Sequence, residues 1–163
     1  PTLAGLERAG IHFKGFIFFG LMVTNDGTYL LEYNMRLGDP ETQVILPLME
    51  NNLLDVILDC LEGKEIDLKF KDEKAVCLVM CSGGYPRQIE TGFEIKNLDK
   101  AKDSQILFAG ASNSGDAIVT SGGRVLSIVA TGDTFENARK KVYDDALKIQ
   151  FDYAFYREDI GKF

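Results

Sequence analysis

The sequence has few of the residues on which several common kinds of site depend. It contains 3 cysteines and 1 histidine among 163 residues. The cysteines Cys60, Cys77 and Cys81 are odd in number and show no CxxC spacing, so neither a zinc site nor a disulfide framework is expected. We predict three buried, reduced thiols in a cytosolic protein. No sequence signal places a Ser or Cys partner beside His12, so a catalytic triad is not supported.

The chain also lacks an excess of positive charge and any long apolar run. Its formal net charge is −7, which argues against nucleic-acid partners because they require a basic surface. No apolar run has the length of a membrane span, and PTLAGLERAG at the start is not a signal peptide. Since the first residue is Pro rather than Met, we expect a fragment or a processed product. These absences favour a globular cytoplasmic protein without a membrane partner.

Two common phosphate-binding loops are missing as well. The sequence contains no GxxxxGK[ST] motif and no GxGxxG motif. If the protein uses ATP, the loop that grips the phosphates is of another type or lies outside this chain.

A β-hairpin is predicted near the N-terminus. The apolar run 15–23 (GFIFFGLMV) forms its first strand, residues 24–27 (TNDG) its turn and residues 28–35 (TYLLEYNM) its second strand. Side chains alternate along a strand. One face of the second strand therefore carries three polar side chains: Glu32, Asn34 and Arg36.

Two helices are predicted to follow the hairpin. Asp39 caps the first helix, Pro40 occupies its first position, and Pro47 kinks or ends it. Asn51-Asn52 offers a cap for the second helix, which Gly63 ends. Its apolar stripe comprises Leu53, Leu54, Ile57, Leu58 and Leu61.

After a charged stretch at 64–74, the pattern changes to short strands, and the class expected for the chain is α+β. Asp133 or Thr134 is predicted to cap a helix in this part. The apolar stripe of that helix is predicted to be Phe135, Ala138, Val142, Ala146 and Ile149. The predicted strands are residues 75–82, 106–111, 117–120, 124–131 and 151–156.

The polar face of the hairpin allows a metal site. Glu32 and Asn34 offer a carboxylate and an amide carbonyl, which are hard oxygen donors suited to Mg²⁺ or Mn²⁺. Two protein ligands are enough if a nucleotide supplies the others. A solvated polar face explains the same pattern, and E-x-N by itself favours that plainer interpretation.

Two further clusters have a binding and a plain interpretation. Arg36 is suited to bind a phosphate or to pair with Glu32 or Glu41, and the turn 38–41 (GDPE) favours an anion or simply caps a helix. Arg124, after Gly122 and Gly123, is suited to hold a phosphate or to lie in an ordinary hairpin turn. On pattern alone, the hairpin turn is favoured for Arg124.

Several blocks together resemble a known family. GFIFFGLMVTNDGTYLLEYNMRLGDPETQVILPLM, AVCLVMCSGGYP, TSGGRVLSIVATG and FDYAFYREDIG follow one another along the chain. In this order they resemble the phosphoribosylamine–glycine ligase (glycinamide ribonucleotide synthetase) family. The resemblance implies that residues 1–68 are the C-terminal piece of an ATP-grasp domain, an antiparallel hairpin plus helices. It also implies that residues 69–163 are a small mixed β domain with one or two helices.

The resemblance further implies an enzyme of purine biosynthesis. This ATP-dependent carboxylate–amine ligase uses ATP as a co-substrate, with Mg²⁺ or Mn²⁺, to join glycine to 5-phosphoribosylamine through glycyl phosphate. Glu32 and Asn34 would bind the metal ion, and Arg36 would be catalytic near the acyl phosphate. The substrate-binding residues implied by the match are Gly38, Asp39, Pro40, Glu41 and Arg124.

The match covers roughly the last two-fifths of the family's chain, more than one average domain. The expected molecule is therefore a ligase fragment that is inactive alone, with the N-terminal lobes of the same enzyme as its missing partner. Apolar surfaces of residues 1–63 should then lack partners and promote self-association. The alternative is a non-catalytic docking or dimerisation domain that completes a partner carrying the nucleotide-gripping lobe.

Overall fold

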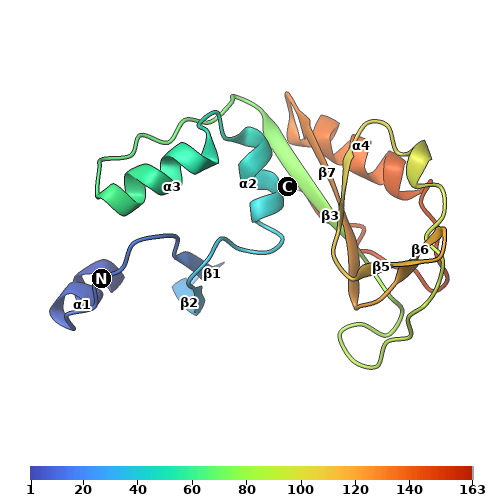
Figure 1. The fold of residues 1–163 in the computed structure, drawn as a ribbon, viewed down its shortest axis with the longest axis horizontal. Coiled ribbons are helices and arrows are strands. Elements are labelled where there is room, and N and C mark those ends of the chain that lie inside the picture. The colour runs from blue at the N-terminus through green and yellow to red at the C-terminus, as the bar shows by residue number, and fades with distance from the viewer. Residues whose placement is uncertain (163) are drawn as a thin grey trace. The chain divides into compact units, whose positions relative to one another are not determined.

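The structure, a computed structural model, describes residues 1–162 and divides into two compact units (Figure 1). The first unit comprises residues 1–38 and 49–70, and the second comprises residues 39–48 and the chain from Lys71 onward. Both units contain helices, and all paired strands are antiparallel. The predicted α+β class is therefore confirmed. No helix in residues 1–162 is long and apolar enough to cross a membrane.

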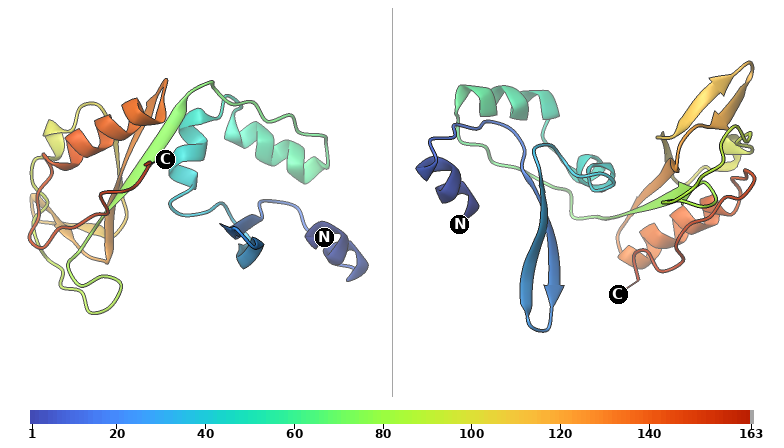
Figure 2. Two further views of the ribbon diagram at one scale, coloured as in Figure 1. Left: turned by 180° about the vertical axis from the view of Figure 1, so that it is seen from behind. Right: turned by 90° about the horizontal axis from the view of Figure 1, so that it is seen from below.

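The first unit is built on one hairpin, which the right-hand view of Figure 2 shows along its length. A register shift between Gly20 and Leu21 pairs Gly20 with Glu32. Asn52 caps the later helix as predicted, since its Oδ1 accepts a hydrogen bond from the Leu54 amide at 2.9 Å, and Gly63 ends that helix at φ 76°. The elements of the unit are α1 (Thr2–Arg8), β1 (Phe18–Thr24), β2 (Gly27–Asn34) and α3 (Leu53–Glu62).

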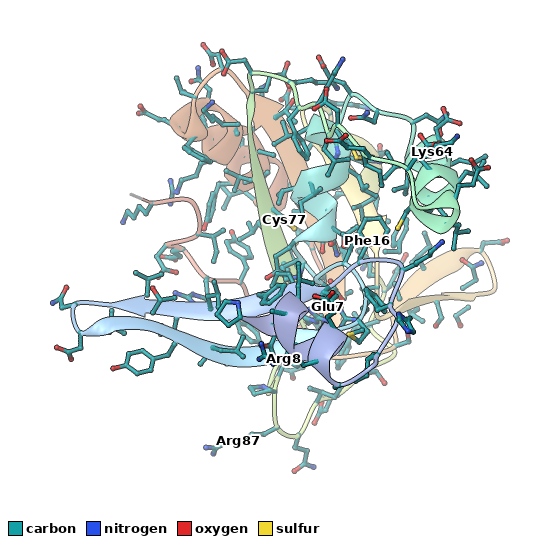
Figure 3. All side chains as sticks on the ribbon, turned by 90° about the vertical axis from the view of Figure 1, so that its left-hand side faces the viewer. Glu7, Arg8, Phe16, Lys64, Cys77 and Arg87 are labelled. Carbon is teal, nitrogen blue, oxygen red and sulfur yellow. The ribbon has the colours of Figure 1, made fainter. Side chains whose placement is uncertain are left out.

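Large apolar side chains of this unit are exposed. Figure 3 shows side chains projecting from the hairpin into the open on both of its faces. On α3 the Leu54 side chain is 61% exposed and Leu61 is 56% exposed, whereas Val56 is buried. The expected unpartnered apolar surface is therefore confirmed for this chain. On the hairpin and α3 it includes Leu21, Met22, Val23, Tyr29, Leu30, Leu31, Tyr33, Leu54, Ile57, Leu58 and Leu61.

The second unit is centred on a three-stranded sheet. Its order is β3 (Lys74–Cys81), β7 (Arg124–Gly132) and β4 (Gln105–Phe108), so β7 is the central strand. Helix α4 (Phe135–Ala146) packs on β3 and β7 and closes the hydrophobic core with them. That core contains Val76, Leu78, Met80, Ile95, Val125, Leu126, Ile128, Ala130, Ala138, Val142, Ala146, Ile149 and Phe151.

A short helix covers the other face of this sheet. Helix α2 (Thr42–Leu48) packs against β3 and β7. Cys77, labelled in Figure 3, lies on β3 between the core residues Val76 and Leu78. The negative charges of Asp39 and Glu41, just before α2, help to raise the pKa of its thiol. The residues before α2 are therefore close to the face opposite α4. The unit also contains η1 (Leu98–Lys100) and a hairpin of β5 (Ala111–Ser114) and β6 (Ala117–Thr120).

Several predicted elements need correction. Helix α2 begins at Thr42 rather than Pro40, and the Asp39–Pro40 bond is cis. The Asp39 carboxylate accepts from side chains instead of capping the helix, because Gln43 and Arg124 donate to it. The carbonyl of Glu41 accepts the first helical bonds, from Val44 and Ile45 at 3.1 Å each.

In the second unit, residues 106–111 do not form one strand. Strand β4 ends at Phe108 and β5 starts at Ala111, because the chain turns between them at Gly110. The backbone packs closely there, since an added Cβ at Gly110 would lie 2.7 Å from the Arg124 carbonyl. Residues 151–156 contribute only an isolated bridge, between Phe155 and Cys81. Phe135 is 41% exposed, so it does not join the buried stripe of α4.

The three cysteines are free, but only Cys81 is fully buried. Burial raises the pKa of the Cys77 thiol to about 11. A hydrogen bond with Ser127 lowers this pKa, and the negative charges of Asp39 and Glu41 raise it further. Such a thiol is protonated at neutral pH and is a poor nucleophile. The prediction of three buried thiols is thus wrong for Cys60 and Cys77, which are partly exposed.

Candidate functional site

The polar face predicted for the hairpin exists and forms a short hydrogen-bonded chain. Asn34 Nδ2 donates to Glu32 Oε1 at 2.9 Å, and Arg36 Nη2 lies 3.4 Å from Asn34 Oδ1. Arg36 Nη1 donates to the Leu37 carbonyl at 2.8 Å. Glu32 and Arg36 are exposed, and Asn34 is partly buried. Two polar groups at the end of β2 and Arg36, which follows the strand by two residues, are therefore close together and accessible to a ligand.

Gly20 makes room for the first of these groups. A Cβ at position 20 would lie 2.9 Å from Glu32 Cγ, closer than side chains normally approach. The register shift places this glycine opposite Glu32, where pairing counted from the turn without the shift would place Phe19. The glycine thus allows the Glu32 side chain to lie across β1.

The donors on this face fit a hard divalent cation. Carboxylate and amide oxygens are the ligands that Mg²⁺ and Mn²⁺ prefer, and Glu32 and Asn34 already contact each other. The amide nitrogen of Asn34 now faces Glu32, so its amide must turn over to present the oxygen. No cluster of three or more His, Cys, Asp or Glu that could hold a metal occurs within residues 1–162. Water or substrate phosphates would have to complete the coordination.

A second constellation, within the second unit, joins the turn before α2 to the start of β7. Arg124 Nη2 donates to Asp39 Oδ2 at 2.7 Å, and its Nη1 donates to the Asp39 carbonyl at 3.0 Å. Gln43 Nε2 donates to the other carboxylate oxygen, Oδ1, at 2.8 Å. We call Asp39, Gln43 and Arg124 the Asp39 clamp. The structure thus brings together two of the predicted substrate-binding residues, as a mutual pair.

The glycine-rich loops at one end of the sheet support the clamp. The Arg124 carbonyl accepts from the Gly110 amide at 2.7 Å, and Ser82 Oγ donates to the Gly122 carbonyl at 2.8 Å. An added Cβ at Gly123 would lie 2.3 Å from the Tyr85 ring. The predicted turns at 83–86 and 122–123 therefore pack on each other. The first of them also lines an open cavity of about 340 Å³ with Gly83, Gly84, Gln88, Glu90, Phe93 and Tyr153.

Sequence reasoning missed two residues of these sites. Gln43 lies four residues after Asp39, a spacing that brings side chains together on a helix, and this signal was available. Gly20 was hidden by the register shift. Pairing counted from the Gly27 turn without that shift would put Leu31, not Glu32, opposite Gly20.

Two family models match this chain. The model described as phosphoribosylglycinamide synthetase, ATP-grasp (A) domain, matches residues 1–42. The model described as phosphoribosylglycinamide synthetase, C domain, matches residues 75–163, which is more than half of the chain.

Individual relatives agree with the models. A phosphoribosylamine–glycine ligase of Caldanaerobacter subterraneus subsp. tengcongensis is 45% identical over 163 residues, and one of Clostridium acetobutylicum is 47% identical over 164 residues. Each match covers 99% of this chain but 39% of the relative. A crystal structure of phosphoribosylamine–glycine ligase from Thermotoga maritima matches with a TM-score of 0.84 and 39% identity, over 97% of this chain and 40% of that one. This chain therefore spans about two-fifths of the length of the curated relatives it matches.

Proposed function

This chain belongs to the phosphoribosylglycinamide synthetase family, and we propose that it is part of an ATP-dependent ligase that joins glycine to 5-phosphoribosylamine in purine biosynthesis. The observation that carries the proposal is the match over 99% of this chain to proteins named phosphoribosylamine–glycine ligase. Because the chain spans 39% of their length, we propose that it is inactive alone and needs the N-terminal lobes of such a ligase. A cytoplasmic location is part of the same proposal. We use "whole ligase" below for this chain joined to those lobes.

In the proposed reaction, ATP phosphorylates the carboxylate of glycine. The amine of phosphoribosylamine then attacks the carbonyl carbon of this acyl phosphate, the new amide bond forms, and phosphate leaves. The barrier falls mainly through positioning of the reactants and neutralisation of phosphate charge. Each role proposed for this chain is of one of these two kinds.

We assign Glu32 and Asn34 to the metal ion, Mg²⁺ or Mn²⁺. Their oxygen donors and their mutual contact at 2.9 Å support this role. A bound cation would neutralise charge on the ATP phosphates. Two protein ligands are consistent with the usual coordination of Mg²⁺, which keeps several water ligands and takes others from substrate phosphates.

Arg36 is the proposed catalytic residue. A guanidinium has five N–H donors in a planar fork, and the contacts of Arg36 within the described residues use Nη1 and Nη2. Donors therefore remain for the oxygens of an acyl phosphate, which an arginine can bind with two parallel hydrogen bonds. We assign substrate binding to the turn that follows Arg36 in sequence, Gly38, Asp39, Pro40 and Glu41. Arg124 belongs to this proposal through its contacts with Asp39.

The test measures glycine-dependent ATP hydrolysis by the isolated chain and by the whole ligase. We expect turnover from the whole ligase and none above background from the isolated chain. Robust turnover by the isolated chain would show that it is not an incomplete part. A well-folded whole ligase that makes no glycinamide ribonucleotide would overturn the proposed reaction.

The exposed apolar side chains of the first unit favour one alternative, a non-catalytic domain that docks on a partner or dimerises. Leu54 and Leu61 are more than half exposed, and contiguous apolar surface of this kind marks interaction sites. Size-exclusion chromatography of the chain with and without separately made N-terminal lobes tests this function. A mixed complex that binds tightly but never becomes active would favour docking over catalysis. An active complex would favour the ligase.

A further inference from the structure

We propose that Arg124 is a positioning residue that holds the turn at residues 39–41 in place, and that it does not itself bind an anionic substrate. This inference rests on the proposed ligase function and concerns the role of one residue within it. It is drawn from the Asp39 clamp, in which Arg124 contacts both the carboxylate and the main-chain carbonyl of Asp39.

The two contacts determine what Arg124 can do. One nitrogen of the fork donates to Asp39 Oδ2 at 2.7 Å and the other donates to the Asp39 carbonyl at 3.0 Å. A contact to a main-chain oxygen fixes the backbone of the turn as well as a side chain. Meanwhile the carboxylate neutralises the guanidinium charge, and a phosphate approaching Arg124 would be repelled by Asp39.

Gln43 completes the hold on Asp39. Its Nε2 donates to Asp39 Oδ1 at 2.8 Å, so both carboxylate oxygens are engaged. Its Oε1 is buried and has no hydrogen-bond partner within residues 1–162. Because Asp39 can only accept hydrogen bonds when ionised, the amide must face it with nitrogen. The orphaned oxygen indicates that contact with Asp39 decides the orientation of this amide.

The clamp also has a rigid base. Arg124 is the first residue of β7, which pairs with β3 on one side and β4 on the other. Its main chain is fixed by the Gly110 amide at 2.7 Å and by pairing with Cys81. The guanidinium therefore extends from the central strand of the sheet to the turn that precedes α2. Both partners are partly exposed, at 38% and 46% of their side chains, and such pairs add little to stability.

A double-mutant cycle in the whole ligase tests the inference. The variants are Arg124→Ala, Asp39→Asn and the combination, each assayed for kcat and for KM of phosphoribosylamine. We expect each single change to lower kcat by roughly 10- to 100-fold, the range in which misplacement by about 1 Å acts. We expect KM for phosphoribosylamine to stay within about threefold and the combination to be no worse than the worse single variant, because both changes release the same turn.

The controls separate positioning from folding and from substrate binding. Arg157→Ala removes another surface arginine, which pairs with Asp159 at 2.6 Å, and should leave activity unchanged. Arg124→Lys should unfold at the same temperature as the parent yet recover only part of kcat, since one ammonium cannot reproduce the fork.

Three results would overturn the inference. These are additive losses in the cycle, a KM for phosphoribosylamine that rises more than tenfold in Arg124→Ala with kcat retained, or unchanged kinetics in all variants. If the parent whole ligase is active, each of these contradicts the clamp alone. If the parent is inactive, the proposed function itself fails.

Discussion

The metal assignment makes a prediction for single residues on β2. Under this assignment, Glu32→Ala or Asn34→Ala removes one of the two proposed oxygen ligands from the protein, and water would have to take its place. We expect either no activity or a rise of at least about tenfold in the Mg²⁺ concentration that gives half-maximal activity of the whole ligase. Even the loss of a residue that only hydrogen-bonds to a metal ligand weakens metal binding by about that factor. Titrating activity against Mg²⁺ and against Mn²⁺ measures the effect.

A matched control lies on the same hairpin. Asp26 is an exposed carboxylate in the turn between β1 and β2, and Asp26→Ala should leave the metal requirement unchanged. Parent-like titration curves for both Glu32→Ala and Asn34→Ala would exclude these residues as metal ligands.

A substitution at Gly20 tests the metal assignment independently, because it moves the Glu32 side chain while leaving the Glu32 carboxylate in the sequence. A methyl group at position 20 would lie 2.9 Å from Glu32 Cγ, so Gly20→Ala must push the Glu32 side chain into another rotamer. We expect a higher Mg²⁺ requirement, with the far-ultraviolet circular dichroism of the chain unchanged. Gly5→Ala is the matched control, since a Cβ there meets no heavy atom within 4 Å. Equal Mg²⁺ requirements in the two variants would mean that the position of Glu32 is unimportant.

At the scale of elements, a buried carboxylate joins α4 to the loop before β4. Asp145 is fully buried near the C-terminal end of α4, where the helix dipole disfavours a negative charge. It accepts from the Asp103 amide at 2.9 Å, the Lys102 amide at 3.3 Å and Lys148 Nζ at 2.7 Å. Burial by itself would raise the pKa of this carboxyl, but these hydrogen bonds outweigh it and lower the pKa.

The lowered pKa of Asp145 predicts how stability depends on pH. A carboxyl with a folded pKa below its unfolded value of about 3.9 stabilises the fold above that pH, and the contribution is lost as pH falls through the folded pKa. We expect Asp145→Asn to reduce the free energy of unfolding at pH 7 by about 1–3 kcal/mol. The gap to the parent should narrow below about pH 4. Urea unfolding of the chain at pH 7, 5 and 3 measures it.

Asp144→Asn is the control for this prediction. Asp144 is a neighbouring carboxylate, but it is about half exposed and pairs only with Lys140 on the same helix among the ion pairs of the described residues. Exposed pairs of this type contribute little, so the variant should follow the parent at every pH. A constant gap between Asp145→Asn and the parent from pH 7 to pH 3 would contradict the role of the ionised group.

Local signals were enough to predict most elements of this fold. The TNDG turn located the hairpin, and Asn52 and Gly63 marked the ends of α3. Predictions failed where a contact distant in sequence decides the structure. Asp39 carries every local mark of a helix cap, but Arg124, 85 residues later, engages its carboxylate instead. Likewise the apolar residues 151–156 fill the edge of a core rather than pair along a strand.

The candidate site divides in the same way. Alternation along the strand predicted that Glu32 and Asn34 lie together, and their hydrogen bond agrees with it. Arg36 was predicted on the same face and contacts Asn34, although β2 ends at Asn34 and Arg36 lies in the bend after it. The sequence offered either a phosphate or a hairpin turn as the environment of Arg124. Its actual partner is Asp39, 85 residues earlier in the chain. A contact between segments so far apart cannot be predicted from the spacing of residues in the sequence. The roles of these residues in binding and catalysis stay predictions.

At the scale of the whole molecule, the two units differ in how completely they bury their apolar residues. The second unit has a closed core in which Leu78, Val125, Leu126 and Ile128 are wholly inaccessible. In the first unit, α3 has one buried apolar side chain, Val56, among the exposed ones. Burial of apolar area is the main favourable term in folding and association. The first unit therefore gains most from a further surface that covers it.

This difference predicts self-association of the isolated chain through the first unit. Leu54 and Leu61 lie on the exposed stripe of α3, and burying such side chains favours association by about 1.5–3 kcal/mol each. We expect the mass measured by size-exclusion chromatography with light scattering to rise with concentration above that of one chain. Leu54→Glu combined with Leu61→Glu should return it toward a single chain. Leu147→Glu, at a leucine 71% exposed in the second unit, should leave association unchanged. If the unmodified chain is monomeric at all concentrations, or if Leu147→Glu dissociates it equally well, the stripe on α3 is not the surface that associates.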